Sequence, residues 1–83
     1  MGWEMDYNEV VALNIRKYRR EAGLTQAALA ERVGMSPQHL SKIERCASSP
    51  TVNTLVKIAE CLDVKPARLF DEYDFDALVH MCF

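Results

Sequence analysis

The chain has 83 residues, of which 49% are hydrophobic and 27% charged. This length is sufficient for one small domain and too short for two. This composition excludes a disordered tail or a low-complexity scaffold. The formal net charge of −2, taken alone, argues against a protein that binds the negatively charged phosphates of nucleic acid.

The three cysteines, Cys46, Cys61 and Cys82, form no C-x-x-C motif and no cluster with histidine. This pattern predicts reduced thiols, with no disulfide framework, no metal site and no cofactor. No apolar run exceeds the four residues of segment 10–13, whereas a membrane-spanning helix needs about 20. Acidic and no basic residues precede Val10, so no secretory signal is expected. The predicted location is cytoplasmic.

The first predicted helix covers about residues 7–22. Apolar side chains recur there at helical spacing, at Val11, Ile15 and Tyr18. Gly23 follows, and a glycine can take the positive φ that ends a helix. The body of the chain has no sustained period-two pattern, so no strand is expected there.

Two short helices are predicted next. Thr25 can cap a helix that ends at Gly34 and has its apolar face at Leu29, Ala30 and Val33. Ser36 followed by Pro37 places a hydroxyl cap before a proline at the first helical position. The third helix then runs to about residue 45, with two inward side chains, Leu40 and Ile43.

A loop is predicted over residues 46–50, after which Thr51 can cap a fourth helix. Its expected core stripe consists of Val52, Leu55, Ile58, Ala59 and Leu62. Pro66 opens a short fifth helix over residues 67–70, and an acidic segment follows. Five short helices with connections of two to six residues predict an all-α domain.

The connection between the second and third helices is the most informative feature. Only Gly34, Met35 and Ser36 join them, and a three- or four-residue turn containing glycine is typical of a helix-turn-helix, whose helices cross at about 90–120°. Ala30 suits the close approach of two backbones, and Gly34 suits a positive φ. A plain αα-corner in a compact fold is the alternative, but the caps, the small residue and the flanking helices together favour the motif.

Over about residues 10–70 the chain resembles the phage repressor/Cro-type DNA-binding domain. The resemblance is carried by segments 15–26, 29–34 and 36–44, then by Pro50, segment 55–62 and segment 69–70. It implies a five-helix domain that binds operator DNA, usually as a homodimer, and regulates transcription. Residues 1–9 would be an N-terminal extension, and residues 71–83 a tail that could serve dimerisation.

The third helix has an exposed polar face comprising Gln38, His39, Ser41, Lys42 and Arg45. A recognition helix lies in the major groove, where Gln can bond adenine and Lys can bond guanine. The resemblance implies base reading by Gln38, Ser41 and Lys42. Pro37 stands at a position often held by Gln, which leaves an apolar contact there, and His39 is a further candidate.

Residues around this helix are candidates for phosphate contacts and positioning: Gln26, Ser36, Arg45, Ser48, Ser49, Thr51, Asn53 and Arg16. Gln26 opens the second helix, where a side-chain amide and the helix N-terminus can bind one phosphate. The resemblance implies that Gln26 also braces the recognition helix.

The chain departs from the family after Arg45. Cys46, Ala47, Ser48 and Ser49 stand where the family usually has glycine and then basic residues. Fewer basic residues mean a weaker nonspecific, salt-sensitive attraction to DNA. Cys46 must either take a positive φ or give the loop another shape. It could serve as a redox sensor or be a free surface cysteine without a function.

Arg19 and Glu44 match a family pair that joins the first helix to the end of the third in a partly buried salt bridge. With Ala30 and Gly34, this pair is predicted to be structural. Removal of one partner from a truly buried pair costs about 3–5 kcal/mol.

The tail has apolar residues at helical spacing, at Phe75, Leu78, Val79 and Cys82, which predicts a sixth helix. A strand through residues 79–83 is the alternative. Such a segment would either pack back on its own domain or form a homodimer interface.

The sequence thus predicts a DNA-binding transcriptional regulator that acts as a homodimer on a palindromic operator. It would work in the cytoplasm at the nucleoid, and would repress by blocking RNA polymerase or activate by contacting it. The alternative is an antitoxin-like or regulator-binding interaction module with weak or no DNA binding. An enzyme is not expected, because no nucleophile elbow, phosphate-binding glycine loop or metal spacing is present.

The charge is unevenly distributed. Residues 14–45 carry seven basic and three acidic side chains, whereas four acids lie in residues 71–76 and three more precede Val10. The net charge therefore does not exclude DNA, and it predicts modest nonspecific affinity.

Overall fold

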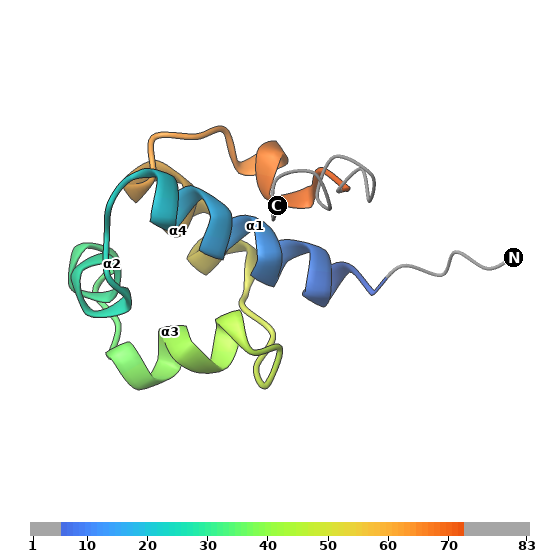
Figure 1. Ribbon diagram of the computed structural model, residues 1–83. Helices are drawn as coiled ribbons and strands as arrows, with labels where there is room; N and C mark the ends of the chain where they lie inside the picture. Colours follow the sequence, from blue (N-terminus) through green and yellow to red (C-terminus); the bar gives the residue numbers. More distant parts are fainter. Residues whose placement is uncertain (1–5, 73–83) are drawn as a thin grey trace, which may run out of the picture.

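A computed structural model describes residues 6–72 of the protein. Its elements are α1 (Tyr7–Glu21), α2 (Gln26–Val33), α3 (Pro37–Glu44), α4 (Val52–Cys61) and the 3-10 helix η1 (Pro66–Phe70) (Figure 1). No strand occurs between residues 6 and 72, so the all-α prediction is confirmed for that part of the chain. The predicted sixth helix, the alternative strand and residues 1–5 lie outside the described residues.

The fifth helix differs in type from the prediction. It is a 3-10 helix of five residues, a tighter geometry that proteins use in short pieces. Its N-cap, Lys65, makes no side-chain capping bond, so little besides Pro66 and tertiary packing defines its start.

Each α-helix begins with a side chain that accepts a hydrogen bond from a free backbone N–H. Thr25 accepts from Ala28 N, and Ser36 accepts from His39 N. Thr51 plays the same role for α4, so all three predicted N-caps are confirmed. Asp6, which accepts from Asn8 N, is a fourth cap that was not predicted.

The four α-helices also end alike, with a residue in the left-handed region. Gly23 (φ 72°) and Gly34 (φ 90°) follow α1 and α2, as predicted. Cys46 (φ 62°) and Asp63 (φ 59°) occupy this conformation after α3 and α4. Cys46 therefore takes the positive φ that was one of its two alternatives, although a Cβ there costs about 1–2 kcal/mol.

The core forms where all five elements meet, and its fully buried large side chains are Ile15, Leu29, Leu40, Ile43, Ile58 and Leu69. Val52 was predicted to belong to it, but that prediction is wrong, because this side chain is 73% exposed. Val52 is the first residue of α4. The apolar stripe of α4 extends to Val52, but the neighbouring helices bury the stripe only from Leu55 onward. Leu55 is 7% exposed.

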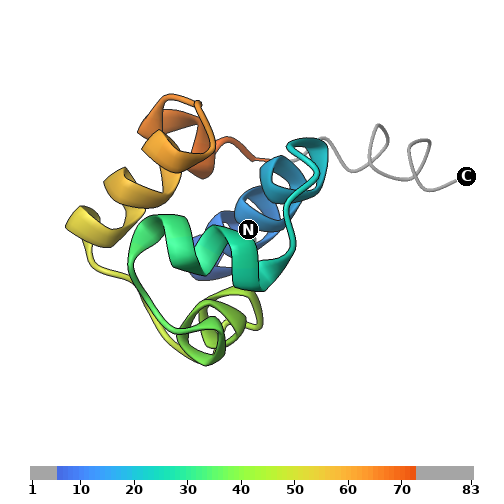
Figure 2. The ribbon, with the colours of Figure 1, turned by 90° about the vertical axis from the view of Figure 1, so that its left-hand side faces the viewer.

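The arrangement places α3 at the edge of the domain. In Figure 1, α3 lies along the lower edge and the segment between α4 and η1 along the upper edge. The turned view in Figure 2 shows α2 next to α3, while α1 and α4 lie on either side. Among the described helices, none is long and apolar enough to span a membrane.

A buried polar side chain ties the end of the described chain to α1. Asn14 is 2% exposed, and its Nδ2 donates to the carbonyl oxygens of Leu69 and Asp71, both at 2.9 Å. These bonds give a side-chain donor to one carbonyl group within η1 and to one just after it. The only indication of this contact in the sequence is a polar residue within an apolar stretch.

A second contact joins the same two segments at the surface. The hydroxyl of Tyr7 donates to Glu72 Oε2 at 2.7 Å. This hydrogen bond and the charge of the carboxylate raise the pKa of Tyr7 above its ordinary value of 10.0.

Candidate nucleic-acid interface

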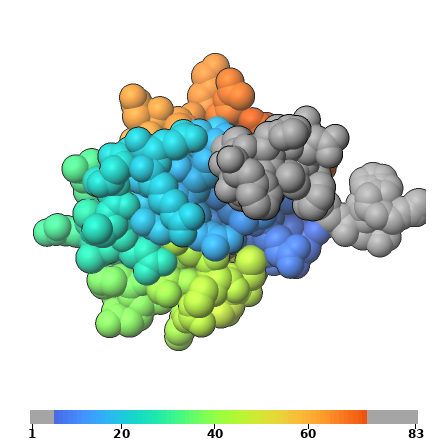
Figure 3. All heavy atoms as spheres, viewed as in Figure 1, coloured from blue at the N-terminus to red at the C-terminus, as the bar shows by residue number. Residues whose placement is uncertain are grey.

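Helix α3 separates its residues into a buried and an exposed set. Leu40, Ile43 and Glu44 are buried. The outer surface of α3 forms the lower edge of the molecule in Figure 3. The predicted base readers lie on that outer side: Pro37, Gln38, His39 and Lys42 are exposed, and Ser41 is half-buried.

Five of the predicted residues are brought together around one open hollow on α3, lined by Pro37, Gln38, Ser41, Lys42 and Arg45. His39 is exposed but does not line this hollow. Within it, Arg45 Nε donates to Ser41 Oγ at 3.3 Å, across one helical turn. The hollow therefore carries two cationic side chains, Lys42 and Arg45, together with the amide of Gln38.

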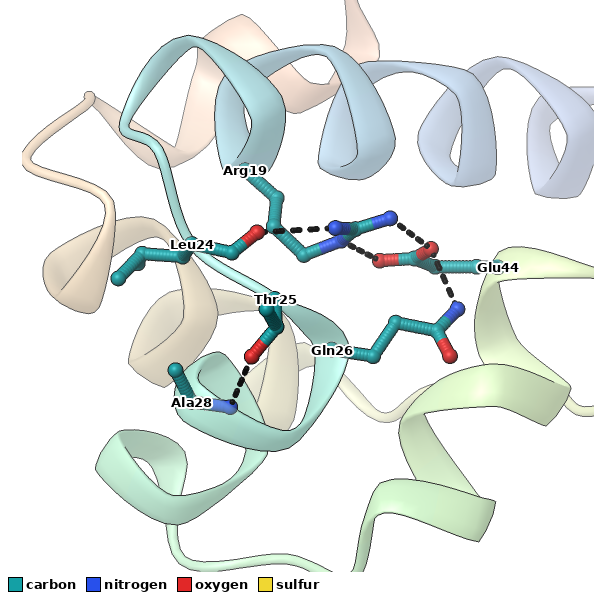
Figure 4. A network of polar contacts seen from close by, with 6 residues as sticks. All are labelled: Arg19, Leu24, Thr25, Gln26, Ala28 and Glu44. Atoms are coloured by element: carbon teal, nitrogen blue, oxygen red, sulfur yellow. Dashed lines mark hydrogen bonds and ion pairs between the residues drawn. The ribbon is translucent and has the colours of Figure 1, made fainter.

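The acidic residue of α3 faces the other way, into a network with α1 and α2 (Figure 4). Arg19 Nε donates to Glu44 Oε2 at 2.8 Å, and Arg19 Nη2 donates to Glu44 Oε1 at 3.0 Å. The two side chains are 11% and 1% exposed. This is a two-bond pair, the geometry that favours arginine over lysine.

The network includes two further bonds, one of which involves α3. Gln26 Nε2 donates to Glu44 Oε1 at 2.9 Å, and Arg19 Nη1 donates to the carbonyl oxygen of Leu24 at 2.9 Å. The first of these joins the start of α2 to the end of α3. A carboxylate bonded in this way adds no exposed negative charge to the outer face of α3.

The N-cap of α3 engages a hydroxyl and a backbone N–H that could otherwise bind a phosphate. Ser36 Oγ accepts from His39 N at 3.1 Å, and Pro37 has no N–H. Thr51 is similarly engaged, because its Oγ1 accepts from Thr54 N at 3.2 Å and lies 3.0 Å from Thr54 Oγ1. These hydroxyls are positioned mainly as helix caps.

The loop after α3 contributes polar groups beside this helix. Ser49 and Asn53 are exposed, and Ser48 is half-buried. Cys46 is exposed, and its Sγ lies 3.7 Å from the carbonyl oxygen of Asn8.

Arg16 lies apart from the hollow on α3. It lines a second hollow between α1 and the end of α3, together with Glu9, Leu13, Glu44, Arg45 and Cys46. Arg16 is half-buried, and its Nε is buried without a hydrogen-bond partner among residues 6–72. The structure thus places Arg16 next to Arg45 rather than next to Gln38.

Ala30 and Gly34 are found where the motif requires a small and a left-handed residue. Ala30 is 0% exposed in the core beside α3 and α4. A Cβ built on Gly34 meets nothing within 4 Å, so the positive φ alone disfavours other residues there.

Comparison with known proteins places this geometry in a family. The helix-turn-helix family model matches residues 15–69, which include α2, α3 and their connection. The transcriptional regulator y4dJ of Sinorhizobium fredii, itself uncharacterised, is 41% identical over 70 residues, or 84% of this chain and 91% of the relative. SinR of Bacillus subtilis, a transcriptional regulator, is 36% identical over 64 residues, or 76% of this chain and 58% of SinR.

A solved structure carries the same fold in the presence of DNA. The crystal structure of SinR, the master regulator for biofilm formation, in complex with DNA superposes with a TM-score of 0.70 at 35% identity. The match covers 74% of this chain and 98% of that one. The family and its members are regulators rather than enzymes. The chain therefore belongs to the helix-turn-helix family of transcriptional regulators, with the DNA-binding fold of the phage repressor/Cro type, to which the P22 c2 repressor is similar in structure.

Proposed function

We propose that this chain regulates transcription as a homodimer on a palindromic operator, with α3 of each copy in the major groove. The observation that carries the proposal is the asymmetry of α3. Its acid, Glu44, is 1% exposed and bonded to Arg19 and Gln26. Its outer face presents Gln38 and Lys42, whose side chains match adenine and guanine edges in the major groove.

Residues on either side of α3 would hold the sugar-phosphate backbone. Gln26 at the start of α2 has its amide nitrogen on Glu44 and retains its helix N-terminal position for a phosphate. Ser48, Ser49 and Asn53 would contribute from the loop and the start of α4, and Arg16 from α1. Ser36 and Thr51 would act through the helix ends that they cap.

The loop has serines where the family usually has basic residues, so few cations face the backbone. The plot of log affinity against log salt concentration falls more steeply by about 0.9 for each phosphate that a cation neutralises. We therefore expect a shallow salt dependence, with specificity that depends on base contacts from α3. The regulator would work in the cytoplasm at the nucleoid, where it would block or contact RNA polymerase.

Two copies on two-fold-related half-sites would place their recognition helices about 34–36 Å apart. A single α3 reads only a few base pairs, because its eight residues span about 12 Å at 1.5 Å per residue. A homodimer doubles the sequence read without a new domain, which supports this oligomeric state.

The test is a gel-shift titration of the wild-type chain and Gln38→Ala on duplex DNA at low and moderate salt, with the mass of the complex determined in solution. The proposal predicts two chains per duplex and weaker, less selective binding by Gln38→Ala. Equal helical circular dichroism of the two proteins is the control for folding. Absence of any shift at low salt would instead favour a protein-interaction module, in line with the net charge of −2.

A further inference from the structure

Two arginines form ion pairs among residues 6–72, and Arg45 is not one of them. Arg19 is bonded to Glu44, and Arg68 is bonded to Asp71. No carboxylate forms an ion pair with Arg45 among residues 6–72. Its neighbour Glu44 is already occupied by Arg19 and Gln26. The guanidinium of Arg45 is exposed at the C-terminal end of α3.

The bond to Ser41 determines how that guanidinium is presented. Arg45 Nε donates to Ser41 Oγ at 3.3 Å, so the nitrogen nearest the chain is engaged within the helix. Within residues 6–72, the two terminal nitrogens form no hydrogen bond and can act as a fork. Such a fork matches guanine O6 and N7, the commonest specific contact between proteins and DNA.

The same bond changes the assignment of Ser41. Its oxygen accepts from Arg45, and the residue is half-buried, whereas Gln38 and Lys42 are exposed. Ser is also the shortest polar side chain of this face. Its position fits a residue that orients Arg45 better than one that reaches a base edge.

The distance along α3 between Gln38 and Arg45 determines which base pair Arg45 would contact. Arg45 follows Gln38 by seven residues, which is about 10 Å along an α-helix, or about three base pairs. Lys42 lies between them, and all three side chains line one hollow. In a recognition helix the N-terminal residues lie nearest the base edges. Arg45 stands at the C-terminal end of α3, farther from the bases, and its long side chain can span that distance.

From these observations we propose that Arg45 reads a guanine about three base pairs from the one contacted by Gln38, and that Ser41 is its positioning residue. The assignment rests on the proposed DNA binding. It makes Arg45 a specificity determinant rather than a phosphate contact. It also lengthens the sequence that each copy reads.

The experiment is selection of bound sequences from random duplex DNA by the wild type, Arg45→Gln, Ser41→Ala and the double variant. Arg45→Gln is expected to lose the guanine preference at one position of each half-site, with about 10- to 100-fold weaker binding to the wild-type operator. Ser41→Ala is expected to weaken the preference at that same position. It should change nothing further when Arg45 is already Gln.

Lys65→Gln is the matched control, because it removes the same charge from the exposed segment between α4 and η1, opposite α3 in Figure 1. A phosphate contact by Arg45 would appear as uniformly weaker binding with unchanged base preference and a salt slope lower by about 1. That result overturns the assignment. If Ser41→Ala changes a different position, Ser41 is itself a reader. Wild-type protein that binds no DNA at low salt would contradict the proposed function and the assignment together.

Discussion

Arg19 of α1 and Glu44 at the end of α3 form a buried two-bond ion pair, with contacts of 2.8 and 3.0 Å. The pair joins α1 to α3 across 25 residues of sequence. A buried pair is costly to break, because the remaining charge has no partner. We therefore expect the pair to hold α3 at one angle to α1.

Single substitutions of this pair should be more harmful than the double substitution. We expect Arg19→Met and Glu44→Leu each to lower the free energy of unfolding by about 3–5 kcal/mol, and the double variant to lose less than their sum. Urea denaturation of the four proteins measures the coupling. Arg68→Met, at an exposed pair with Asp71, is the control and should change stability by less than about 1 kcal/mol. Additive single effects would show that the pair is not coupled.

Cys46 is held in a conformation that glycine adopts more easily. Its φ is 62°, so Cys46→Gly removes a cost of about 1–2 kcal/mol, part of which the greater freedom of the unfolded glycine chain offsets. We expect a net stabilisation of about 0.5–1 kcal/mol in thermal unfolding under reducing conditions.

Two controls isolate the backbone effect at Cys46. Cys46→Ala removes the thiol and keeps the Cβ, so it should give no such gain. Gly34→Ala should lose about 1–2 kcal/mol through φ alone, because a Cβ there meets nothing within 4 Å. Equal stabilisation by Cys46→Ala and Cys46→Gly would mean that the thiol, not the φ, is unfavourable.

Asn14 should matter more for stability than its place on a helix suggests. Asn14→Ala leaves the carbonyl oxygens of Leu69 and Asp71 without their side-chain donor, and we expect a loss of about 2–3 kcal/mol. Asn53→Ala, at an exposed position, is the matched control and should fall within about 0.5 kcal/mol. A small loss at Asn14 would show that water replaces the amide readily.

The contact between Tyr7 and Glu72 predicts a pH dependence at alkaline pH. Because the pKa of Tyr7 is raised above 10.0 in the folded protein, the contact stabilises the fold below about pH 10 and is lost as the pH rises through the raised pKa. Phenolate absorbance is the measurement, with Tyr7→Phe to assign the transition. Glu72→Gln should move that transition to lower pH, and an unchanged curve would contradict the contact.

Local chemistry explains which parts of this fold were predictable. Thr25, Ser36 and Thr51 cap their helices through bonds to residues three positions away, so the signal lies within one short segment. Gly23 and Gly34 similarly end helices by a property of their own backbone. These features mark the starts of α2 to α4 and the ends of α1 and α2 without knowledge of the tertiary structure.

Features that depend on distant neighbours were not predictable in this way. Val52 continues an apolar stripe, but the sequence does not show that the covering helices end before it. Asn14 donates to carbonyl oxygens 55 and 57 residues away, and the residues next to Asn14 in the sequence do not indicate that contact. The pairing of Arg19 with Glu44 was expected from the family resemblance, and spacing alone would not have found it.

The measurement that most directly tests whether this chain reads DNA through α3 is selection of bound sequences from random duplex DNA by the wild-type protein. The proposal predicts enriched sequences with two-fold-related half-sites, their centres about 34–36 Å apart, and loss of one preferred base pair per half-site in Gln38→Ala. Enrichment of no sequence at low salt, by protein with an intact helical fold, would contradict it.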